Sequence, residues 1–285
     1  MEVAHVDRLK VTILSENTVG APLGLVGEWG LALLVETPDA RILLDTGAQG
    51  HMVANAALLG VDLRTVDALV LSHGHYDHTG GLKAFLEVRG RLPVYAHPRL
   101  FDFHYSTVPH KHYVGVPFRL AELKSLGADF VWVREPREIA PGLWVSGEVP
   151  RRTSFERGDP RLISLEDPED DTGKPDPLYD DMSLYAVTPP GLVVILGCAH
   201  AGVVNIVEHA REVTGVDAVY GVIGGTHLGP VDEEQRRATT EYLEKLNLQF
   251  LAANHCTGLS TITTLAQFFG PRFRYAPAGA TFELP

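Results

Sequence analysis

Cysteine is scarce in this chain of 285 residues, since Cys198 and Cys256 are its only two. So few cysteines exclude a disulfide framework and suit a reducing compartment. Long hydrophobic runs are also missing, because no segment approaches the roughly 18 to 20 apolar residues of a membrane span. The stretch from Met1 to Lys10 mixes polar and apolar residues and lacks the apolar core of a signal peptide. We therefore expect a cytoplasmic protein without a membrane partner.

Basic residues are outnumbered, because 24 lysines and arginines face 36 aspartates and glutamates, for a formal net charge of -12. This charge repels a polyphosphate backbone, so we expect no nucleic-acid partner and disfavour a nuclease. Hydrophobic residues at 45% and charged residues at 21% are typical of a globular protein with a sizeable core. The oligomeric state is not determined by these numbers.

Apolar, strand-like runs alternate with helical patterns along almost the whole chain, without a repeat or a low-complexity linker. This pattern predicts one α/β domain over residues 1–285. A helix is predicted over 51–59, where it stops at Gly60. Strands are predicted over 11–14, 30–36, 41–45, 68–71, 183–188, 192–196, 218–223 and 250–253.

Two segments depart from this rhythm. Residues 97–127 are rich in histidine and aromatic residues without clean periodicity, and we interpret them as a candidate lid over a site. Their histidines, such as His104, are predicted to lie on the surface or in the lid. Residues 158–181 are acidic and punctuated by proline, so a solvated loop is expected there, because like charges tend to stay in water.

The strongest signal is the run LSHGHYDHTGGL that begins at Leu71 and places three histidines and an aspartate within six positions. It follows a predicted buried strand, and such crowding of imidazoles is not core packing. His73 and His75 leave the strand two positions apart and can point the same way, whereas Asp77 and His78 lie on the following turn. The run therefore predicts ligands for two metal ions.

Each later apolar run also ends in residues that can bind metal. These residues are Cys198 and His200, then His227, then His255 and Cys256. Ligands bind outside the carboxyl ends of strands in open α/β sheets, so we expect these ends to converge on the histidine-rich run. Imidazole and carboxylate groups suit several metals. We expect two divalent transition-metal ions, with zinc as the first candidate and iron, manganese or nickel as alternatives.

The run HGHYDH after an apolar strand resembles the HxHxDH signature of the metallo-β-lactamase superfamily, and LLDTG at 43–47 resembles its first motif. The blocks DTGAQGHMVANAALLGVDL, GCAHAGVVN, IGGTHL and NHCTG resemble a branch of metal-dependent hydrolases that includes the archaeal dihydropterin ribofuranosyl-aminobenzene phosphate synthase. These blocks span most of the chain, from Asp45 to Gly258. The resemblance implies a four-layer αββα sandwich in which two mixed sheets are flanked by helices.

The resemblance also implies roles for single residues. His73 and His75 match the histidines of the first metal. Asp77 and His78 match the pair of the second metal. The remaining matches are His255, which closes the second site, and Asp45, which orients the metal loop from behind the ligands.

Two positions depart from the superfamily's pattern. No histidine lies between His112 and His200, so the third ligand of the first metal is missing from its usual place. The strand at 192–196 ends in Gly-Cys-Ala-His, where the superfamily has Gly-Asp with a bridging aspartate. We assign His200 as the replacement ligand, with Asp181 as its rival. Cys198 takes the place of the bridging aspartate, either as a ligand or as a small buried residue.

These residues predict a binuclear metal-dependent hydrolase or related transferase, in which a metal-activated water attacks an ester, lactone or phosphoester of a small molecule. Asp77 is the candidate catalytic residue, because its carboxylate can orient that water or accept its proton. His227 either contacts the substrate or is a hydrogen-bonded histidine at a strand end. An anionic group on the substrate has four candidate partners, each more often a solvated charge: Lys111, Arg119, Arg151 and Arg152.

Two other functions remain open from the sequence. A non-hydrolytic di-iron redox protein of the same fold would use the same imidazole and carboxylate ligands. A non-catalytic metal-binding module would hold its metal in a closed site, whereas a catalytic site keeps one metal position open.

Overall fold

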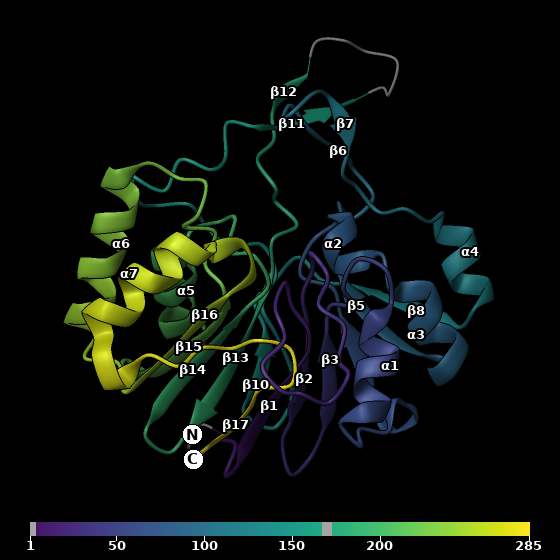
Figure 1. The fold of residues 1–285 in the computed structure, drawn as a ribbon, viewed down its shortest axis with the longest axis horizontal. Helices are drawn as coiled ribbons and strands as arrows, with labels where there is room; N and C mark the ends of the chain where they lie inside the picture. The colour runs from purple at the N-terminus through teal and green to yellow at the C-terminus, as the bar shows by residue number, and fades with distance from the viewer. Residues whose placement is uncertain (1–3, 167–172) are drawn as a thin grey trace.

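The structure, a computed structural model, describes residues 4–166 and 173–285, and two large sheets dominate this part of the chain (Figure 1). The first sheet has the order β17 (Thr281–Leu284), β1 (Leu9–Ser15), β2 (Ala32–Glu36), β3 (Arg41–Leu44), β4 (Ala68–Val70), β5 (Leu92–Ala96) and β8 (Ala128–Trp132). The second has the order β16 (Phe250–Asn254), β15 (Val219–Gly225), β14 (Gly191–Leu196), β13 (Ser183–Thr188), β10 (Leu143–Val145) and β9 (Arg137–Ala140). The predicted strands all occur here, and their bounds differ from the prediction by two residues at most.

Both sheets are mixed, and helices cover their outer faces. Strands β3, β4, β5 and β8 run parallel in the first sheet, as do β14, β15 and β16 in the second, while the remaining pairs are antiparallel. The first sheet is flanked by α1 (His51–Leu58), α3 (Leu82–Arg89) and α4 (Leu120–Ser125), and the second by α5 (Val203–Thr214), α6 (Glu233–Lys245) and α7 (Leu259–Phe269) (Figure 1). The four-layer αββα sandwich is thereby confirmed. Short 3-10 turns span Leu63–Thr65, His255–Thr257 and Gly270–Arg272.

The alternation of side chains along each strand builds this layering. In β14, Val193 and Ile195 pack in the core between the two sheets, whereas Val194 and Leu196 pack under the helices of the second sheet. Successive strand residues face opposite sides of a sheet, so a strand covered on both faces must be apolar throughout. This is why the predicted strands were visible as continuous apolar runs.

A small sheet projects above one end of the sandwich, the end that carries the short helix α2 (Tyr76–Thr79) (Figure 1). Its order is β12 (Lys174–Pro175), β11 (Leu162–Leu165), β6 (Phe103–Ser106) and β7 (His112–Tyr113). Residues 97–127 are therefore not one unit, because β6 and β7 join the small sheet while α4 contacts α3 and β8. We call the small sheet with its connecting loops the cap. Movement of the cap as a lid stays a prediction.

The prediction of a solvated acidic loop over 158–181 holds for Glu166, which is exposed, but is wrong for other acidic residues of its described part. Strands β11 and β12 lie there, and Asp159, Asp180 and Asp181 are buried. Each of these carboxylates has a hydrogen-bond donor that compensates for lost water: the side chain of Arg161 or the backbone amides of Gly74 and Ala201. The acidic residues Asp167, Glu169, Asp170 and Asp171 lie outside the described residues.

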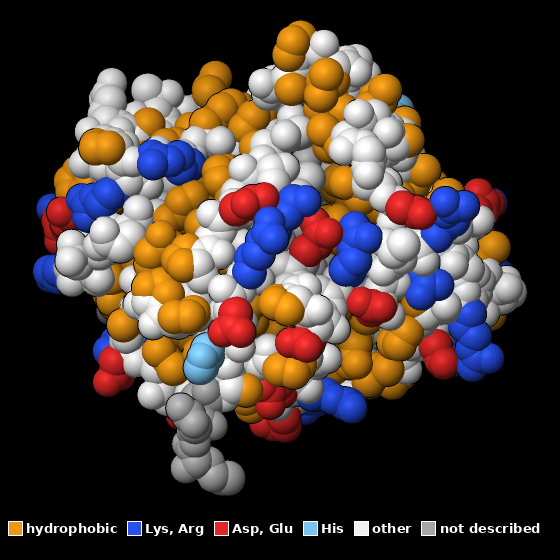
Figure 2. Space-filling model, turned by 90° about the horizontal axis from the view of Figure 1, so that it is seen from below, with side chains coloured by type: hydrophobic (Ala, Val, Ile, Leu, Met, Phe, Trp, Pro, Cys, Tyr) orange, Lys and Arg blue, Asp and Glu red, His pale blue; other side chains and the backbone are white. Residues whose placement is uncertain are grey.

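The face opposite the small sheet carries Lys and Arg side chains interspersed with Asp and Glu (Figure 2). Ion pairs join neighbouring strands, as between Lys10 and Glu36 at 3.2 Å and between Arg8 and Glu283 at 3.3 Å. Among the described residues, this face shows no continuous basic surface. No helix in the described ranges combines the length and low polarity that a transmembrane span requires.

Candidate metal centre

The histidine-rich run leaves β4 at the end of the sandwich beneath the small sheet. His73 and His75 lie on the loop after β4, and Asp77 and His78 lie on α2. The loop passes close to neighbouring backbone, because a Cβ added at Gly74 would lie 2.2 Å from the carbonyl oxygen of Leu100. Only glycine fits that position, so Gly74 allows the loop that carries His73 and His75 to pack closely against the backbone of Leu100.

His73, His75 and His200 form the first group of candidate ligands, and all three are buried. One ligand atom from each lies within 4.8 Å of the others. The Nε2 atom of His73 is 3.0 Å from Nδ1 of His75, and neither ring nitrogen of His200 has a hydrogen-bond partner among the described residues. Buried nitrogens without a partner are costly unless a proton or a cation satisfies them.

Asp77, His78 and His255 form the second group, directly beside the first. The Nε2 atoms of His78 and His255 are 3.1 Å apart, and the Asp77 carboxylate lies 3.4 Å from Nε2 of His255. His255 comes from the end of β16 and Asp77 from α2, so the two large sheets meet at this group. The predicted convergence of the strand ends on the histidine-rich run is therefore observed.

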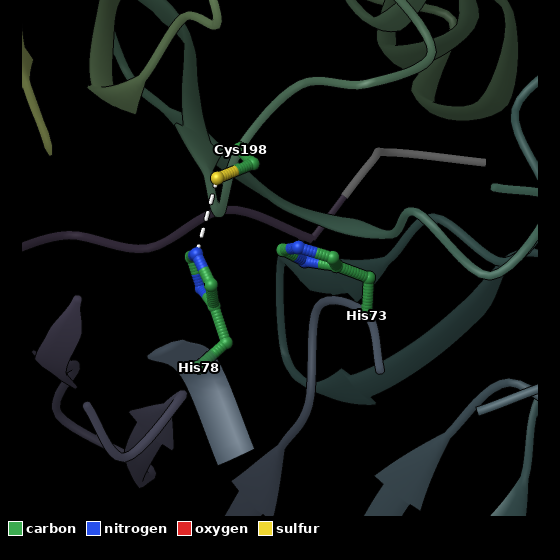
Figure 3. Close-up of side chains that lie close together, drawn as sticks. All are labelled: His73, His78 and Cys198. Atoms are coloured by element: carbon green, nitrogen blue, oxygen red, sulfur yellow. Dashed lines mark hydrogen bonds between the residues drawn. The ribbon is translucent and has the colours of Figure 1, made fainter. Parts of the chain in front are cut away.

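Cys198 lies between the two groups, on the loop after β14 (Figure 3). Its Sγ is 3.0 Å from Nε2 of His78 and belongs to one cluster with His73 and His78. Cys256, predicted as one of the strand-end residues that can bind metal, also lies near Cys198 and His255. The thiol of Cys198 thus occupies the place between the sites that the sequence predicted.

Asp45 orients the candidate ligands from behind. Its carboxylate accepts hydrogen bonds from the backbone N–H of Ser72 at 2.7 Å, from the Ser72 hydroxyl at 2.7 Å and from Nδ1 of His78 at 2.6 Å. The Ser72 oxygen in turn lies 2.9 Å from Nδ1 of His73. Holding Nδ1 of each ring in this way leaves Nε2 free to bind a metal.

The backbone around the site is strained. Six described non-glycine residues have a positive φ angle, and four of them lie here: Asp45 at 62°, Ala199 at 56°, His227 at 52° and His255 at 51°. Each such residue costs of order 1–3 kcal/mol, and this strain persists only where the surroundings hold it. His255 shows such support, because its N–H donates to Glu16 and its Nδ1 contacts Asn17 at 3.0 Å.

The protonation states suit metal binding in the first group. Burial, with the neighbouring imidazoles, lowers the pKa of His73 well below its usual value, and burial lowers that of His75 to about 3. These rings are therefore neutral at neutral pH, as metal ligation requires. In the second group burial disfavours charge on His78, yet the Asp45 and Asp77 carboxylates outweigh it and raise its pKa to about 9. The neutral rings of the first group and the unpartnered nitrogens of His75 and His200 fit a divalent metal ion, whereas His78 must release a proton when a metal binds.

Asp181, the rival to His200, supports the ligand loop from behind. Its carboxylate accepts a hydrogen bond of 2.8 Å from the N–H of Ala201, and burial raises its pKa to about 7. Among the described residues it belongs to none of the clusters that could hold a metal. The geometry therefore favours His200 as the third ligand of the first group.

A cavity of about 260 Å³ opens above both groups and is roofed by the small sheet. His227 lies at its wall, with its ring 4.1 Å from that of His200 and its Nε2 3.2 Å from the carboxylate of Asp159. Asp159 also pairs with Arg161, which lines the cavity too. No spacing in the sequence indicated Asp159 and Arg161, because cap residues reach the site only through the folded chain.

The four predicted anion partners lie elsewhere or are occupied. Arg151 donates to the carbonyl oxygens of His200 and Leu178, and Arg152 pairs with Glu212 at 2.8 Å. Arg119 lines a separate cavity at the base of the cap, and Lys111 lies over the ring of Tyr105.

His104, expected on the surface or in the lid, lies on β6 within the candidate lid segment and is buried, so the surface alternative is wrong. Its Nδ1 contacts the carboxylate of Asp176 at 2.6 Å, and its ring packs against His75 at 5.4 Å. Asp176 follows β12 and His104 lies on β6, so two cap segments meet over the metal loop. That pairing is what allows the histidine to leave solvent.

Comparisons with known proteins agree with this geometry. The family model of the metallo-beta-lactamase superfamily matches residues 30–149. The 7,8-dihydropterin-6-methyl-4-(beta-D-ribofuranosyl)-aminobenzene-5'-phosphate synthase of Methanocaldococcus jannaschii is 30% identical over 98% of this chain and 98% of its own.

Two solved structures match as well. A metal-dependent hydrolase of the beta-lactamase superfamily has a TM-score of 0.82 at 25% identity and covers 97% of this chain and 99% of its own. Zinc-bound PqqB from Methylobacterium extorquens has a TM-score of 0.57 at 13% identity, covers 96% and 100%, and shows the fold alone. With the histidine-rich run, the strand-end ligands and a relative matched over nearly its full length, the chain belongs to the metallo-β-lactamase superfamily.

Proposed function

We propose that this chain is a binuclear metal-dependent hydrolase or related transferase that acts on an ester, lactone or phosphoester of a small, anionic molecule. The observation that carries the proposal is the pair of adjacent three-residue groups, His73, His75 and His200 beside Asp77, His78 and His255, beneath one open cavity. Open access to a ligand cluster is typical of a catalytic metal site rather than a structural one.

The candidate metal ions and Asp77 have different roles in the proposed reaction. When bound, a pair of divalent ions, with zinc as the first candidate, would polarise the bond under attack and lower the pKa of a coordinated water. The Asp77 carboxylate lines the cavity floor and orients the attacking water or accepts its proton. Burial opposes ionisation of Asp77, but His78 and His255 outweigh it and lower its pKa, which keeps the carboxylate ionised.

The relative from Methanocaldococcus jannaschii supports a transferase as well as a hydrolase, because its name is that of a synthase. Its named product contains a phosphate, a ribose and a dihydropterin. A phosphorylated metabolite with a pterin-like or nucleotide-like ring is therefore the substrate class that we propose to test first.

The test is to measure metal content and activity together. We expect about two transition-metal ions per purified chain and turnover of at least one reporter among phosphoesters, lactones and thioesters. His75→Ala should lose most of the metal and nearly all activity, whereas His110→Ala should keep both, because His110 lies outside the clusters of described residues that could hold a metal. Wild-type metal content in the His75 variant would contradict the ligand assignment. Activity that depends on the redox state of bound iron would instead support the di-iron alternative.

A further inference from the structure

Trp29 presents an exposed aromatic face at the wall of the cavity above the candidate metal centre. Its side chain is 57% exposed, and its ring centroid lies 5.6 Å from that of His255. Single exposed apolar residues are common on protein surfaces and need no explanation by themselves. The distinguishing features of Trp29 are its place in the cavity and the anchoring of the chain on both sides of it.

The neighbours of Trp29 are tied to the core of the site. Glu28 is buried and accepts hydrogen bonds from the Ser15 hydroxyl at 2.8 Å and from the N–H of Gln49 at 2.7 Å. On the other side, a Cβ added at Gly30 would lie 2.6 Å from the carbonyl oxygen of Asp77. The loop that carries Trp29 is therefore held in place against the segment that carries Asp77. A ligand that contacts the indole loses little binding free energy to the ordering of this loop.

One part of the cavity wall is apolar and suited to a flat apolar group, while another part is polar and carries His227, Asp159 and Arg161. Tyr76, 39% exposed, lines the same cavity, and the cap contributes Val108, Val114 and Leu162. The floor is polar and carries His75, Asp77 and His200. Apolar side chains beside a few convergent polar groups are usual in a small-molecule site, with the polar groups directed at the reacting part.

We propose, on the basis of the function proposed above, that Trp29 is a specificity-determining residue that stacks on a planar aromatic or heteroaromatic ring of the substrate. The reacting group of the same molecule lies over the ligand floor. Indole favours offset or edge contact with another aromatic ring over contact with a puckered, saturated one. The preference for an aromatic over a saturated ring of the same size should be about 3- to 10-fold in Kd.

Binding of two matched phosphonates to zinc-loaded protein tests this proposal by calorimetry. Benzylphosphonate and cyclohexylmethylphosphonate share the same anionic group and a non-hydrolysable carbon–phosphorus bond, so only the ring differs. Wild-type protein should prefer the benzyl compound. Trp29→Leu should abolish the preference while retaining its zinc, and Trp29→Phe should restore part of it. Trp132→Leu is the matched control, because Trp132 is 41% exposed but lines the separate cavity at the base of the cap.

Equal affinity for the two compounds in wild-type protein, or an undiminished preference in Trp29→Leu, overturns the role of Trp29. Failure of the proposed function has a different signature. In that case the aromatic preference persists and depends on Trp29, while no ester, lactone or phosphoester is turned over.

Discussion

At the scale of single residues, the orientation of two candidate ligands depends on Asp45. One carboxylate receives three hydrogen bonds, and through Ser72 it reaches His73 as well as His78. Rings held in this way present a fixed nitrogen to a metal and lose little freedom on binding. Within residues 4–166 and 173–285, neither ring nitrogen of His200 has such a partner, so its contribution needs a direct test.

His200→Ala should reduce metal content as strongly as His73→Ala, because each removes one imidazole from the same group. Asp181→Asn should keep the metal, since the amide oxygen can still accept from Ala201 and the side chain keeps its shape. We expect a loss of affinity of at least about 10-fold for the histidine variants, from the usual cost of disturbing a metal site. Metal analysis after dialysis measures it. Metal loss in the Asp181 variant alone would reverse the assignment.

Cys198 is either a metal ligand or a buried thiol that only packs, and these two roles predict different reactivity. Without metal, burial raises the pKa of its thiol well above the usual value, so it should react slowly as a thiol. A ligand near two ions would be an unreactive, metal-shielded thiolate, and removing the metal would expose it to alkylation. In a Cys256→Ser background, we expect faster alkylation of Cys198 after chelation, measured by mass spectrometry. Equal rates in both states, in protein that stays folded, would identify Cys198 as packing.

At the scale of elements, α5 begins at Val203, three residues after His200. The buried carboxylate of Glu156 holds its first turn. Glu156 accepts hydrogen bonds from the N–H of Val204 at 2.8 Å and of Asn205 at 3.0 Å, two donors that the first turn of a helix leaves free. The same carboxylate accepts from Thr153 at 2.8 Å. These hydrogen bonds connect the segment that contains Thr153 and Glu156 to the start of α5, the helix that follows His200.

Glu156→Ala should destabilise the protein by about 1–3 kcal/mol, because it strands buried donors at this helix start. For a chain of this size the melting temperature should fall by roughly 2–10 °C. Glu212→Ala, which removes an exposed partner of Arg152, is the control and should leave the melting temperature almost unchanged. Thermal unfolding followed by circular dichroism decides the matter, and matching curves for the two variants would contradict the capping role.

At the scale of the whole molecule, the free energy of unfolding should depend on pH through His209, which lies outside the candidate metal centre. His209 on α5 is buried, its Nδ1 lies 3.0 Å from the Tyr185 hydroxyl, and burial lowers its pKa. The unfolded chain gains a proton at this residue near its usual pKa of about 6.5, whereas the folded chain does not. The contribution of His209 is therefore present above that pH and is lost as pH falls through it.

The comparison of wild-type protein with His209→Gln isolates this effect, because both share every other titrating group. Between about pH 7.5 and pH 5.5, wild-type protein should lose a few °C of melting temperature more than the variant, on the order of 2–4 °C. Parallel melting temperatures across that range would show that His209 protonates equally in both states.

Much of the fold could be read from the sequence, because its strands are apolar on both faces and its helix starts and stops are local features. The candidate ligands from His73 to His78 were visible for the same reason, since six consecutive positions carry them. The strand-end residues His200 and His255 followed from the rule that strand ends meet at one edge. Each inference needed only neighbours in sequence or a general property of sheets.

The cap and the cavity wall depended on contacts between distant segments. β6 pairs with β11 across more than fifty residues, and the buried Asp180 and Asp181 accept hydrogen bonds from the backbone of Gly74 and Ala201, which are also distant in sequence. Likewise, Trp29 and Arg161 carry no spacing that marks them, yet the folded chain brings both to one cavity. The sequence alone determined the strands and the run of candidate ligands, because periodicity and ligand chemistry are local, whereas the four-layer sandwich was expected only from the resemblance to the metallo-β-lactamase superfamily. Tertiary structure alone decided what surrounds the candidate ligands, because burial and partner choice arise only when remote segments pack together.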